Sequence, residues 1–264
     1  MPSSPFILVT PGATRGIGLA LTRQYLRTTN LPVYASHRTQ ASVKEIKNLV
    51  LGPLADVDPE RLNLLHLDLT SEESIGFAAH SLSESFRIKG LQNPYIHTAF
   101  ISGGILVPEK KPADLDLETI TQTFQINIIS HLLIIKHFWR FLPSRSQKGL
   151  EYPAKWAHIS ARVGSIEDNR RGGWYSYRAS KAALNQVVKT FDLHLEQSKM
   201  QAICVGVHPG TVKTDLSKEF WATDVKNDFF EPADAALNLI DVVKNLSITQ
   251  RGKLWDWAGK EVPW

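Results

Sequence analysis

Two side chains that could exchange a proton, Tyr177 and Lys181, lie four residues apart in the chain. On a helix this spacing places both side chains on one face, so the ammonium can lie beside the phenol. A positive charge about 4 Å away, at an effective dielectric constant near 20, is worth roughly 4 kcal/mol. We therefore expect the pKa of this tyrosine to fall by about two to three units from about 10. The same spacing occurs on many solvent-exposed helices, so the chemistry depends on what else the chain provides.

A glycine-rich turn lies between the first expected strand and the first expected helix, in the run Pro11-Gly12-Ala13-Thr14-Arg15-Gly16-Ile17-Gly18. Glycines allow a tight turn and close backbone approach to a pyrophosphate, and the helix N-terminus then directs N–H donors at the anion. A strand, glycines and a helix in this order are typical of a dinucleotide site. The residues expected to bind the dinucleotide here are Gly12, Thr14, Arg15, Gly16, Ile17 and Gly18.

The end of the second expected strand indicates which dinucleotide is bound. A carboxylate about twenty residues past the glycines binds the ribose of NAD, whereas an arginine there accommodates the 2′-phosphate of NADP. Arg38 lies twenty residues after Gly18, and Glu45 is the first acidic residue of the chain. Arg15 adds a second positive charge. We therefore predict NADPH or NADP as the cofactor, with His37 and Arg38 among its contacts.

Short β-rich runs alternate with longer helical patterns, which predicts a parallel sheet covered by helices on both faces. We expect strands near 6–10, 32–36, 62–67, 95–101, 155–160, 202–207 and 253–257, and helices over 16–29, 41–51, 71–87, 117–142, 175–197 and 232–245. These elements predict one Rossmann-type α/β domain over residues 1–264, with a doubly wound, seven-stranded parallel sheet.

Two segments have unusual patterns. The helix expected around 124–142 is apolar on nearly every side, which indicates deep burial or a subunit contact, and a homodimer or homotetramer is one expectation. The segment 214–231 fits no regular element and carries the aromatic residues Phe220, Trp221, Phe229 and Phe230. It either packs as a structural cover or forms a mobile lid over a substrate pocket.

Composition and charge argue against several classes of function. The net charge of +4 is spread along the 264 residues, without the blocks of like charge expected of a nucleic-acid arm. The longest early apolar run, 6–9, is too short for a membrane span or a signal-peptide core. No cluster of His, Cys and Asp has metal-ligand spacing, and the single Cys204 forms no internal disulfide. We expect a cytoplasmic protein that binds no nucleic acid, membrane or metal.

Taken together, the glycine turn, the Tyr177 and Lys181 pair and the expected domain resemble the classical short-chain dehydrogenase/reductase family over almost the whole chain. Gly12, Gly16 and Gly18 match the family's TGxxxGxG turn, with Pro11 in place of its threonine. The other matches are Asp68-Leu69 for the segment that contacts the adenine, Asn127 for the active-site asparagine, Tyr177 and Lys181 for the YxxxK motif, and the run His208 to Thr214, with Pro209, Gly210, Val212 and Thr214, for the PG segment beside the nicotinamide.

The segments 172–178 and 256–264 further resemble the carbonyl-reductase branch often called sniffer or C-factor-like. The resemblance implies hydride transfer from NADPH to the carbonyl carbon of a hydrophobic ketone or aldehyde, with Tyr177 giving a proton to the oxygen. Lys181 would lower the pKa of Tyr177 and hold the nicotinamide ribose. Asn127 would support a water that leads to Lys181.

The chain departs from the family in two places. Where the family has NNAG, this chain has Ile101-Ser102-Gly103-Gly104, so the asparagine amides that brace the loop are missing. Ser102, Gly103 and Gly104 are still expected to contact the cofactor. The second departure is Ala161, at the place of the catalytic serine, whose hydroxyl in the family donates to the developing oxyanion. Loss of one such donor typically costs about 10²–10³ in rate.

Three interpretations of Ala161 follow. Another group, Ser160, Ser165, Tyr175 or a substrate hydroxyl, takes over the role; or the protein is a slower or specialised reductase; or it binds NADPH as a scaffold or sensor with little redox turnover, guiding a non-redox step such as a cyclisation. Ser160 on an extended strand would point to the opposite face. The residues expected to face the substrate are Ser160, Ala161, Trp174, Phe220 and Trp221.

Overall fold

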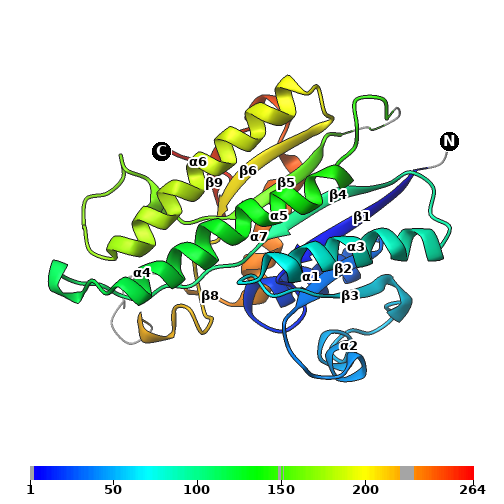
Figure 1. Ribbon diagram of the computed structural model, residues 1–264, viewed down its shortest axis with the longest axis horizontal. Coiled ribbons are helices and arrows are strands. Elements are labelled where there is room, and N and C mark those ends of the chain that lie inside the picture. Colours follow the sequence, from blue (N-terminus) through cyan, green and yellow to red (C-terminus); the bar gives the residue numbers. More distant parts are fainter. Residues whose placement is uncertain (1–2, 148–149, 151, 221–228) are drawn as a thin grey trace.

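A mainly parallel β-sheet forms the centre of the fold (Figure 1). In the computed structural model, which describes residues 3–147, 150, 152–220 and 229–264, eight strands form this sheet in the order β10-β9-β6-β5-β4-β1-β2-β3. The strands are β1 Ser4–Thr10, β2 Val33–His37, β3 Leu62–His66, β4 Pro94–Ile101, β5 Ala154–Ile159, β6 Ala202–His208, β9 Leu254–Asp256 and β10 Glu261–Val262. The seven predicted parallel strands are confirmed. β10 adds an antiparallel strand beside β9, and two residues give too short an alternation to be predicted.

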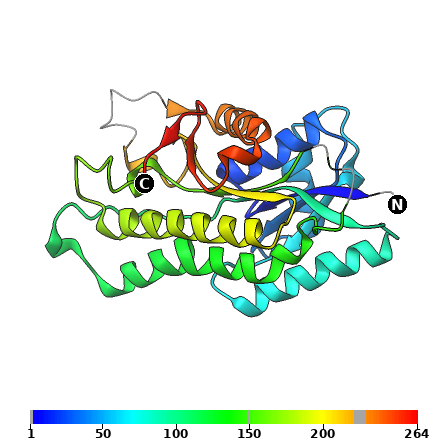
Figure 2. The same ribbon diagram turned by 90° about the horizontal axis from the view of Figure 1, so that it is seen from above.

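Helices cover both faces of the sheet. They are α1 Gly16–Thr28, α2 Val43–Leu51, α3 Glu72–Ile88, α4 Leu117–Phe124, α5 Ser130–Phe138, α6 Tyr175–Gln197 and α7 Pro232–Asn245. Figure 2 shows α1 and α7 on one face, with α3, α5 and α6 on the other, and each face has its own cluster of buried apolar side chains. This is the doubly wound arrangement that the sequence predicts. In the described part of the chain, no helix is long and apolar enough to cross a membrane.

Helix α2 begins with a local capping box, whereas α6 does not. Ser42 N donates to the Glu45 carboxylate at 2.8 Å, and Glu45 N donates to Ser42 Oγ at 3.2 Å. At the start of α6 the N-cap residue Trp174 has a left-handed backbone (φ 51°, ψ 49°), and its side chain makes no cap hydrogen bond. The first N–H groups of α6 therefore need acceptors from elsewhere in the chain.

The helix predicted over 117–142 is interrupted. A π-helical turn, Gln125–Ile129, separates α4 from α5, and Ser130 N donates to Gln125 O, five residues back. Such turns are often found at functional sites. The buried Asn127 lies in the middle of this one.

The apolar side chains of α5 serve the core on one face only. Ile134 and Phe138 are fully buried, whereas Leu132 and Trp139 are 46% and 37% exposed. The exposed pair lines a groove between α5 and α6 together with Phe191 and other α6 residues. Burial explains one face of the helix, and a subunit contact stays a prediction for the other.

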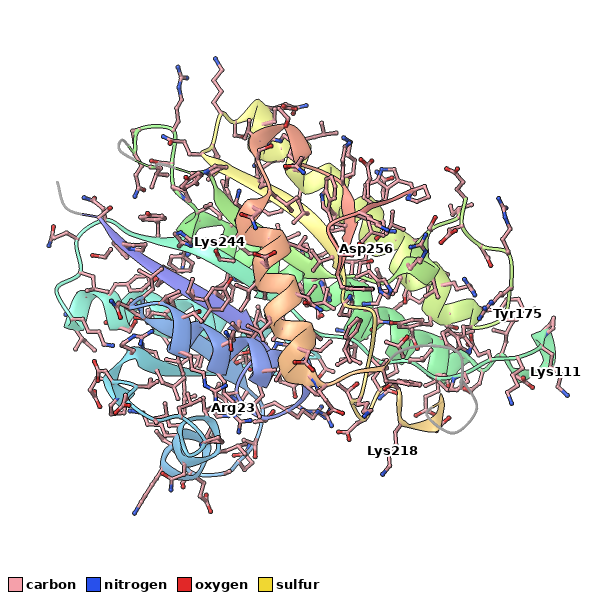
Figure 3. All side chains as sticks on the ribbon, turned by 180° about the vertical axis from the view of Figure 1, so that it is seen from behind. Arg23, Lys111, Tyr175, Lys218, Lys244 and Asp256 are labelled. Carbon is pink, nitrogen blue, oxygen red and sulfur yellow. The ribbon has the colours of Figure 1, made fainter. Side chains whose placement is uncertain are left out.

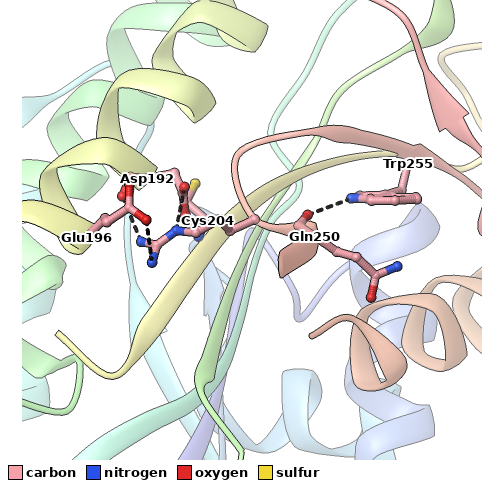
Figure 4. Close-up of polar contacts among 6 residues, drawn as sticks. Asp192, Glu196, Cys204, Gln250 and Trp255 are labelled. Atoms are coloured by element: carbon pink, nitrogen blue, oxygen red, sulfur yellow. Dashed lines mark hydrogen bonds and ion pairs between the residues drawn. The ribbon is translucent and has the colours of Figure 1, made fainter. Parts of the chain in front are cut away.

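The C-terminal strands are anchored to α6 and β6 by buried polar contacts (Figure 4). Arg251 Nε donates to Asp192 Oδ2 at 2.8 Å, and the other carboxylate oxygen of Asp192 accepts from Cys204 N at 2.9 Å. Trp255 Nε1 donates to Gln250 O at 3.2 Å. The Cys204 thiol is free and buried, which raises its pKa, as expected for a cysteine that packs as a small apolar side chain. These contacts fix β9 beside β6, whose end leads into the PG segment.

Candidate active site

Two glycines of the turn, Gly12 and Gly18, are packed so closely that neither leaves room for a side chain. A Cβ on Gly12 would lie 2.9 Å from Thr22 Oγ1, which donates to Gly12 O at 2.7 Å. A Cβ on Gly18 would collide with Pro11 O. The turn after β1 thus holds its backbone against the first turn of α1, as a pyrophosphate site requires.

Gly16 opens α1 in a conformation that favours glycine. Its φ is +58°, and a Cβ there would lie 3.6 Å from Thr214 Cγ2. The turn and the PG segment, almost two hundred residues apart in the chain, therefore adjoin one another. Thr14 and Ile17 are half-buried in the same turn.

The predicted cations differ in their surroundings. Arg38 is exposed directly after β2, and Thr70 hydrogen bonds together with the Arg38 charge lower the pKa of the Asp68 carboxyl. Arg15 lies 3.3 Å from Asp215, and both side chains are exposed, so this pair is weak. The contact of Arg38 with a 2′-phosphate stays a prediction.

His37 is a buried, neutral side chain at the end of β2. Its side chain is buried, with Nδ1 3.3 Å from Thr39 O, and burial lowers its pKa. A neutral imidazole at the end of β2 leaves Arg38 as the charged member of this predicted pair.

The loop after β4 joins the glycine turn. Ser102 Oγ donates to Pro11 O at 2.7 Å. A Cβ on Gly103 would lie 2.7 Å from Leu69 Cδ1, so Leu69 packs directly on this loop. Residues expected to hold the adenine, the pyrophosphate and the nicotinamide ribose thus meet at the carboxyl ends of β1, β3 and β4.

A chain of buried hydrogen bonds braces this loop from behind. Trp156 Nε1 donates to His158 Nε2 at 2.9 Å, so His158 carries its proton on Nδ1 and donates it to His131 Nδ1 at 2.8 Å. His131 Nε2 then donates to Gly103 O at 3.0 Å. Burial lowers the pKa of His131 to about 3, so the chain stays neutral. His131 and His158 thus hold the backbone of the loop at Gly103.

Tyr177 and Lys181 both lie in α6, as predicted, and are 7% and 2% exposed. Lys181 Nζ lies 5.7 Å from the centre of the Tyr177 ring and donates to Ile159 O, at the end of β5, at 2.9 Å. A Cβ on Gly104 would lie 3.5 Å from Lys181 Nζ. The ammonium is therefore at the junction of the loops after β4 and β5.

The two groups have pKa values shifted by burial. Burial raises the pKa of Tyr177 and lowers the pKa of Lys181 to about 8. For the protein without a bound cofactor, the prediction that the pKa of Tyr177 is lowered is therefore wrong. Desolvation of the phenolate raises this pKa by more than the equally buried ammonium lowers it. Tyr177 is protonated and Lys181 largely charged at neutral pH.

Asn127 connects the loop after β4 to α6. Its Oδ1 accepts from Ile105 N at 2.8 Å, and its Nδ2 donates to Ile105 O at 3.0 Å and to Ser180 Oγ at 2.9 Å. The side chain is completely buried. These hydrogen bonds fix the position of the loop after β4 relative to α6, the helix that carries Tyr177. The predicted support of a water toward Lys181 remains a proposal.

The place of the catalytic serine is filled by the methyl group of Ala161, which is 7% exposed. Ser160 Oγ donates to Asn185 Oδ1 at 2.7 Å, and Ser165 Oγ accepts from Asp168 N at 3.0 Å. Both serines are buried, whereas Tyr175 is 41% exposed. The hydroxyls of Ser160 and Ser165 are thus both hydrogen-bonded to protein groups.

The PG segment is held by aromatic contacts. Gly210 has φ +76°, and a Cβ there would lie 2.7 Å from the Phe230 ring and 3.0 Å from the Trp257 ring. Pro209 is buried beside it. Val212 lies in β7 (Thr211–Val212), which pairs in parallel with β8 (Phe229–Phe230).

The expected lid is described at its two ends only. Thr214 N donates to Ser217 Oγ at 3.3 Å, and a short 3₁₀ turn covers Lys218–Phe220. Trp221, with the rest of 221–228, lies outside the described residues. Figure 3 labels Lys218 in this segment, and it labels Tyr175 and Lys111 at one end of the molecule, where α6 begins.

Trp174 lies beside the predicted proton donor. Its ring centre is 6.2 Å from that of Tyr177, with an angle of 75° between the planes. This is the edge-to-face geometry that aromatic pairs favour, and a contact of Trp174 with the substrate stays a prediction.

Some residues of the site were not predicted. Glu109, His131 and Ser180 hold Trp174, Gly103 and Asn127 respectively, from positions far away in the chain. No local pattern marks them, because each acts through a partner brought near by the fold. Among the described residues, no group of three or more His, Cys, Asp or Glu side chains could hold a metal ion.

Comparisons with known proteins agree with this geometry. A family described as short chain dehydrogenase matches residues 5–225. The 1-hydroxy-2-glutathionyl-2-methyl-3-butene dehydrogenase of Rhodococcus sp. is 32% identical over 198 residues, which are 75% of this chain and 78% of that protein.

Two solved structures cover all of this chain and are covered completely by it. The NADPH-bound carbonyl reductase from chicken fatty liver is 27% identical, with a TM-score of 0.79. The carbonyl reductase Sniffer of D. melanogaster is 22% identical, with a TM-score of 0.80, which shows a shared fold. With the family match over 5–225 and the motif residues gathered at one edge of the sheet, the chain belongs to the short-chain dehydrogenase/reductase family of oxidoreductases.

Proposed function

We propose that this protein is an NADPH-dependent carbonyl reductase that acts on a hydrophobic ketone or aldehyde. The observation that carries the proposal is the position of Tyr177 and Lys181, buried beside Gly104 at the carboxyl edge of the sheet. The similarity to an NADPH-bound carbonyl reductase at 27% identity supports it.

The residues at this edge suit NADPH. The turn at Gly12 and Gly18 has room for backbone alone, and Arg38 offers an exposed cation where the 2′-phosphate is expected. Ser102, Gly103 and the PG segment would hold the nicotinamide end. When bound, NADPH supplies the hydride for the carbonyl carbon.

The side chains of this protein would supply the proton and stabilise the group that donates it. Tyr177, kept protonated by burial, donates its hydroxyl proton to the carbonyl oxygen as that oxygen gains charge. The Lys181 ammonium, fixed by Ile159 O, favours the phenolate that remains. Asn127 holds the loop at the distance from α6 that this transfer needs.

A second candidate is an NADPH-bound scaffold or sensor with little redox turnover. The observation in its favour is that Ser160 Oγ, the hydroxyl next to Ala161, is bonded to Asn185. Loss of the usual hydrogen-bond donor to the oxyanion raises the activation free energy by about 2.7–4 kcal/mol, which slows turnover and still permits it.

The test is consumption of NADPH, followed by absorbance, with a panel of aromatic and alicyclic ketones and aldehydes. Carbonyl reduction predicts NADPH oxidation that depends on the substrate and gives the corresponding alcohol. Tight NADPH binding with no alcohol formed from any compound would favour the scaffold instead.

A further inference from the structure

The carboxylate of Glu109 caps the helix that carries the proposed proton donor. Glu109 lies in the loop between β4 and the turn Pro112–Asp114, and it is 1% exposed. Ser176 N donates to Glu109 Oε2 at 2.6 Å, and Ser176 Oγ donates to Oε1. Because Trp174 makes no side-chain cap, this remote carboxylate occupies the place of the missing local one.

The buried negative charge is balanced by the helix itself. In the described part of the chain, no Lys, Arg or His side chain forms an ion pair with Glu109. The N-terminal end of α6 carries a partial positive charge and free N–H groups, and both stabilise a carboxylate. The start of α6 therefore provides hydrogen-bond partners for both oxygens of the Glu109 side chain.

The backbone of Glu109 fixes the next residue of the site. Glu109 O accepts from Trp174 N at 2.7 Å, and the Trp174 ring packs edge-to-face on Tyr177. The side chain and the carbonyl of one residue thus hold Trp174 and the first turn of α6 together. Tyr177 directly follows Ser176, which donates two hydrogen bonds to the Glu109 carboxylate.

The loop is tied at a second point. Asn127 binds both the N–H and the carbonyl of Ile105, and Asn127 in turn binds Ser180 of α6. The five residues 105–109 are therefore fastened to α6 at both ends, one turn apart on the helix. The position of the segment 105–109 relative to α6 therefore depends on these two sets of hydrogen bonds.

We propose that Glu109 is a positioning residue for the reduction. It fixes the segment 105–109 and Trp174 relative to Tyr177, and so determines how the carbonyl substrate is held. This inference rests on the proposed reductase function. The glycine turn contacts Ser102 and Thr214, whereas Glu109 contacts the start of α6, so we expect NADPH binding to be independent of Glu109.

The experiment compares Glu109→Ala, Glu109→Gln and the matched control Glu45→Ala, which removes the capping carboxylate of α2. Glu109→Ala is expected to lower kcat/KM for the carbonyl substrate 10- to 100-fold, mainly through KM for bulky substrates, with the NADPH Kd changed less than twofold. Glu109→Gln should recover activity to within about threefold, since its amide can accept from Ser176 N and donate to Ser176 Oγ.

A merely structural Glu109 would give a different result. Glu109→Ala would then lower Tm, as we expect for Glu45→Ala, and leave kcat and KM unchanged well below Tm, which would overturn the inference. If the wild-type protein reduces no carbonyl compound, the proposed reductase function is wrong. Amide hydrogen exchange then tests whether Glu109 positions the segment 105–109. Faster exchange in Glu109→Ala confined to 105–109 and 174–178 would support the positioning role, and unchanged exchange there would refute it.

Discussion

At the scale of single residues, the site consists of a phenol and an ammonium that are both removed from water. The sequence predicts the pair through its spacing and the family motif, and the structure confirms that both lie in α6. The direction of the tyrosine pKa shift is not predictable from spacing, because it depends on burial in the folded protein. The role of Ser160 depends likewise on Asn185, which no local pattern connects to it.

The charge of Lys181 gives a pH dependence. Its pKa is lowered by burial to about 8, so the side chain is charged below that pH and neutral above it. Because the charged form supports proton donation, kcat/KM for NADPH, which reports on the free enzyme, should fall as the pH rises through about 8. Steady-state rates between pH 6 and 10 measure this, and a level profile up to pH 10 would contradict it.

Restoring the missing hydroxyl tests the role of Ala161. Ala161→Ser adds one oxygen where the family has its oxyanion donor, so kcat should rise, by up to about 10²-fold. Ala179→Ser, on the exposed face of α6, is the matched control and should leave kcat unchanged. An unchanged kcat in Ala161→Ser would mean that another group already donates to the oxyanion.

At the scale of elements, the carboxyl ends of the parallel strands and the start of α6 position the site. Periodicity predicts α6 over 175–197 and α7 over 232–245, as observed, since both carry regular apolar faces. It predicts one helix over 117–142, because a π-helical turn of five residues leaves the apolar pattern continuous. Glu109 is not predicted, since in the sequence it stands in a polar loop before Lys110 and Lys111.

The bracing of the loop after β4 gives a prediction at this scale. His131→Ala would leave Gly103 O and His158 Nδ1 without partners in a buried place, so the free energy of unfolding should fall by about 2 to 5 kcal/mol. NADPH affinity should fall as well, because the loop loses its support. Urea denaturation and NADPH titration measure both effects, with the exposed His80→Ala as control. A variant as stable as wild type would show that the hydrogen-bond chain is dispensable.

At the scale of the whole molecule, the proposed dinucleotide site draws on residues spread from Gly12 to Thr214, so cofactor binding should stabilise the entire fold. NADPH at 100 times its Kd adds about 2.7 kcal/mol to the free energy of unfolding. For a chain of this size that corresponds to a Tm increase of roughly 5 to 10 °C.

The same thermal unfolding measurement tests the choice of cofactor. NADH at equal concentration should raise Tm less, because it lacks the phosphate that Arg38 would meet. Arg38→Ala should remove the difference, whereas Arg27→Ala, on an exposed position of α1, should keep it. Equal shifts with both cofactors in the wild-type protein would contradict the NADP preference.

Tyr177 is the proposed proton donor in an NADPH-dependent reduction, and single-turnover kinetics of Tyr177→Phe test this role. The variant is mixed with NADPH deuterated at the transferable position, and deuterium in the alcohol product is counted by mass spectrometry. The account predicts NADPH binding within about threefold of wild type and a rate of deuterium transfer reduced at least 10²-fold. Tyr95→Phe, a buried tyrosine at the opposite edge of the sheet, should transfer deuterium at the wild-type rate. Transfer by Tyr177→Phe at the wild-type rate would contradict the account.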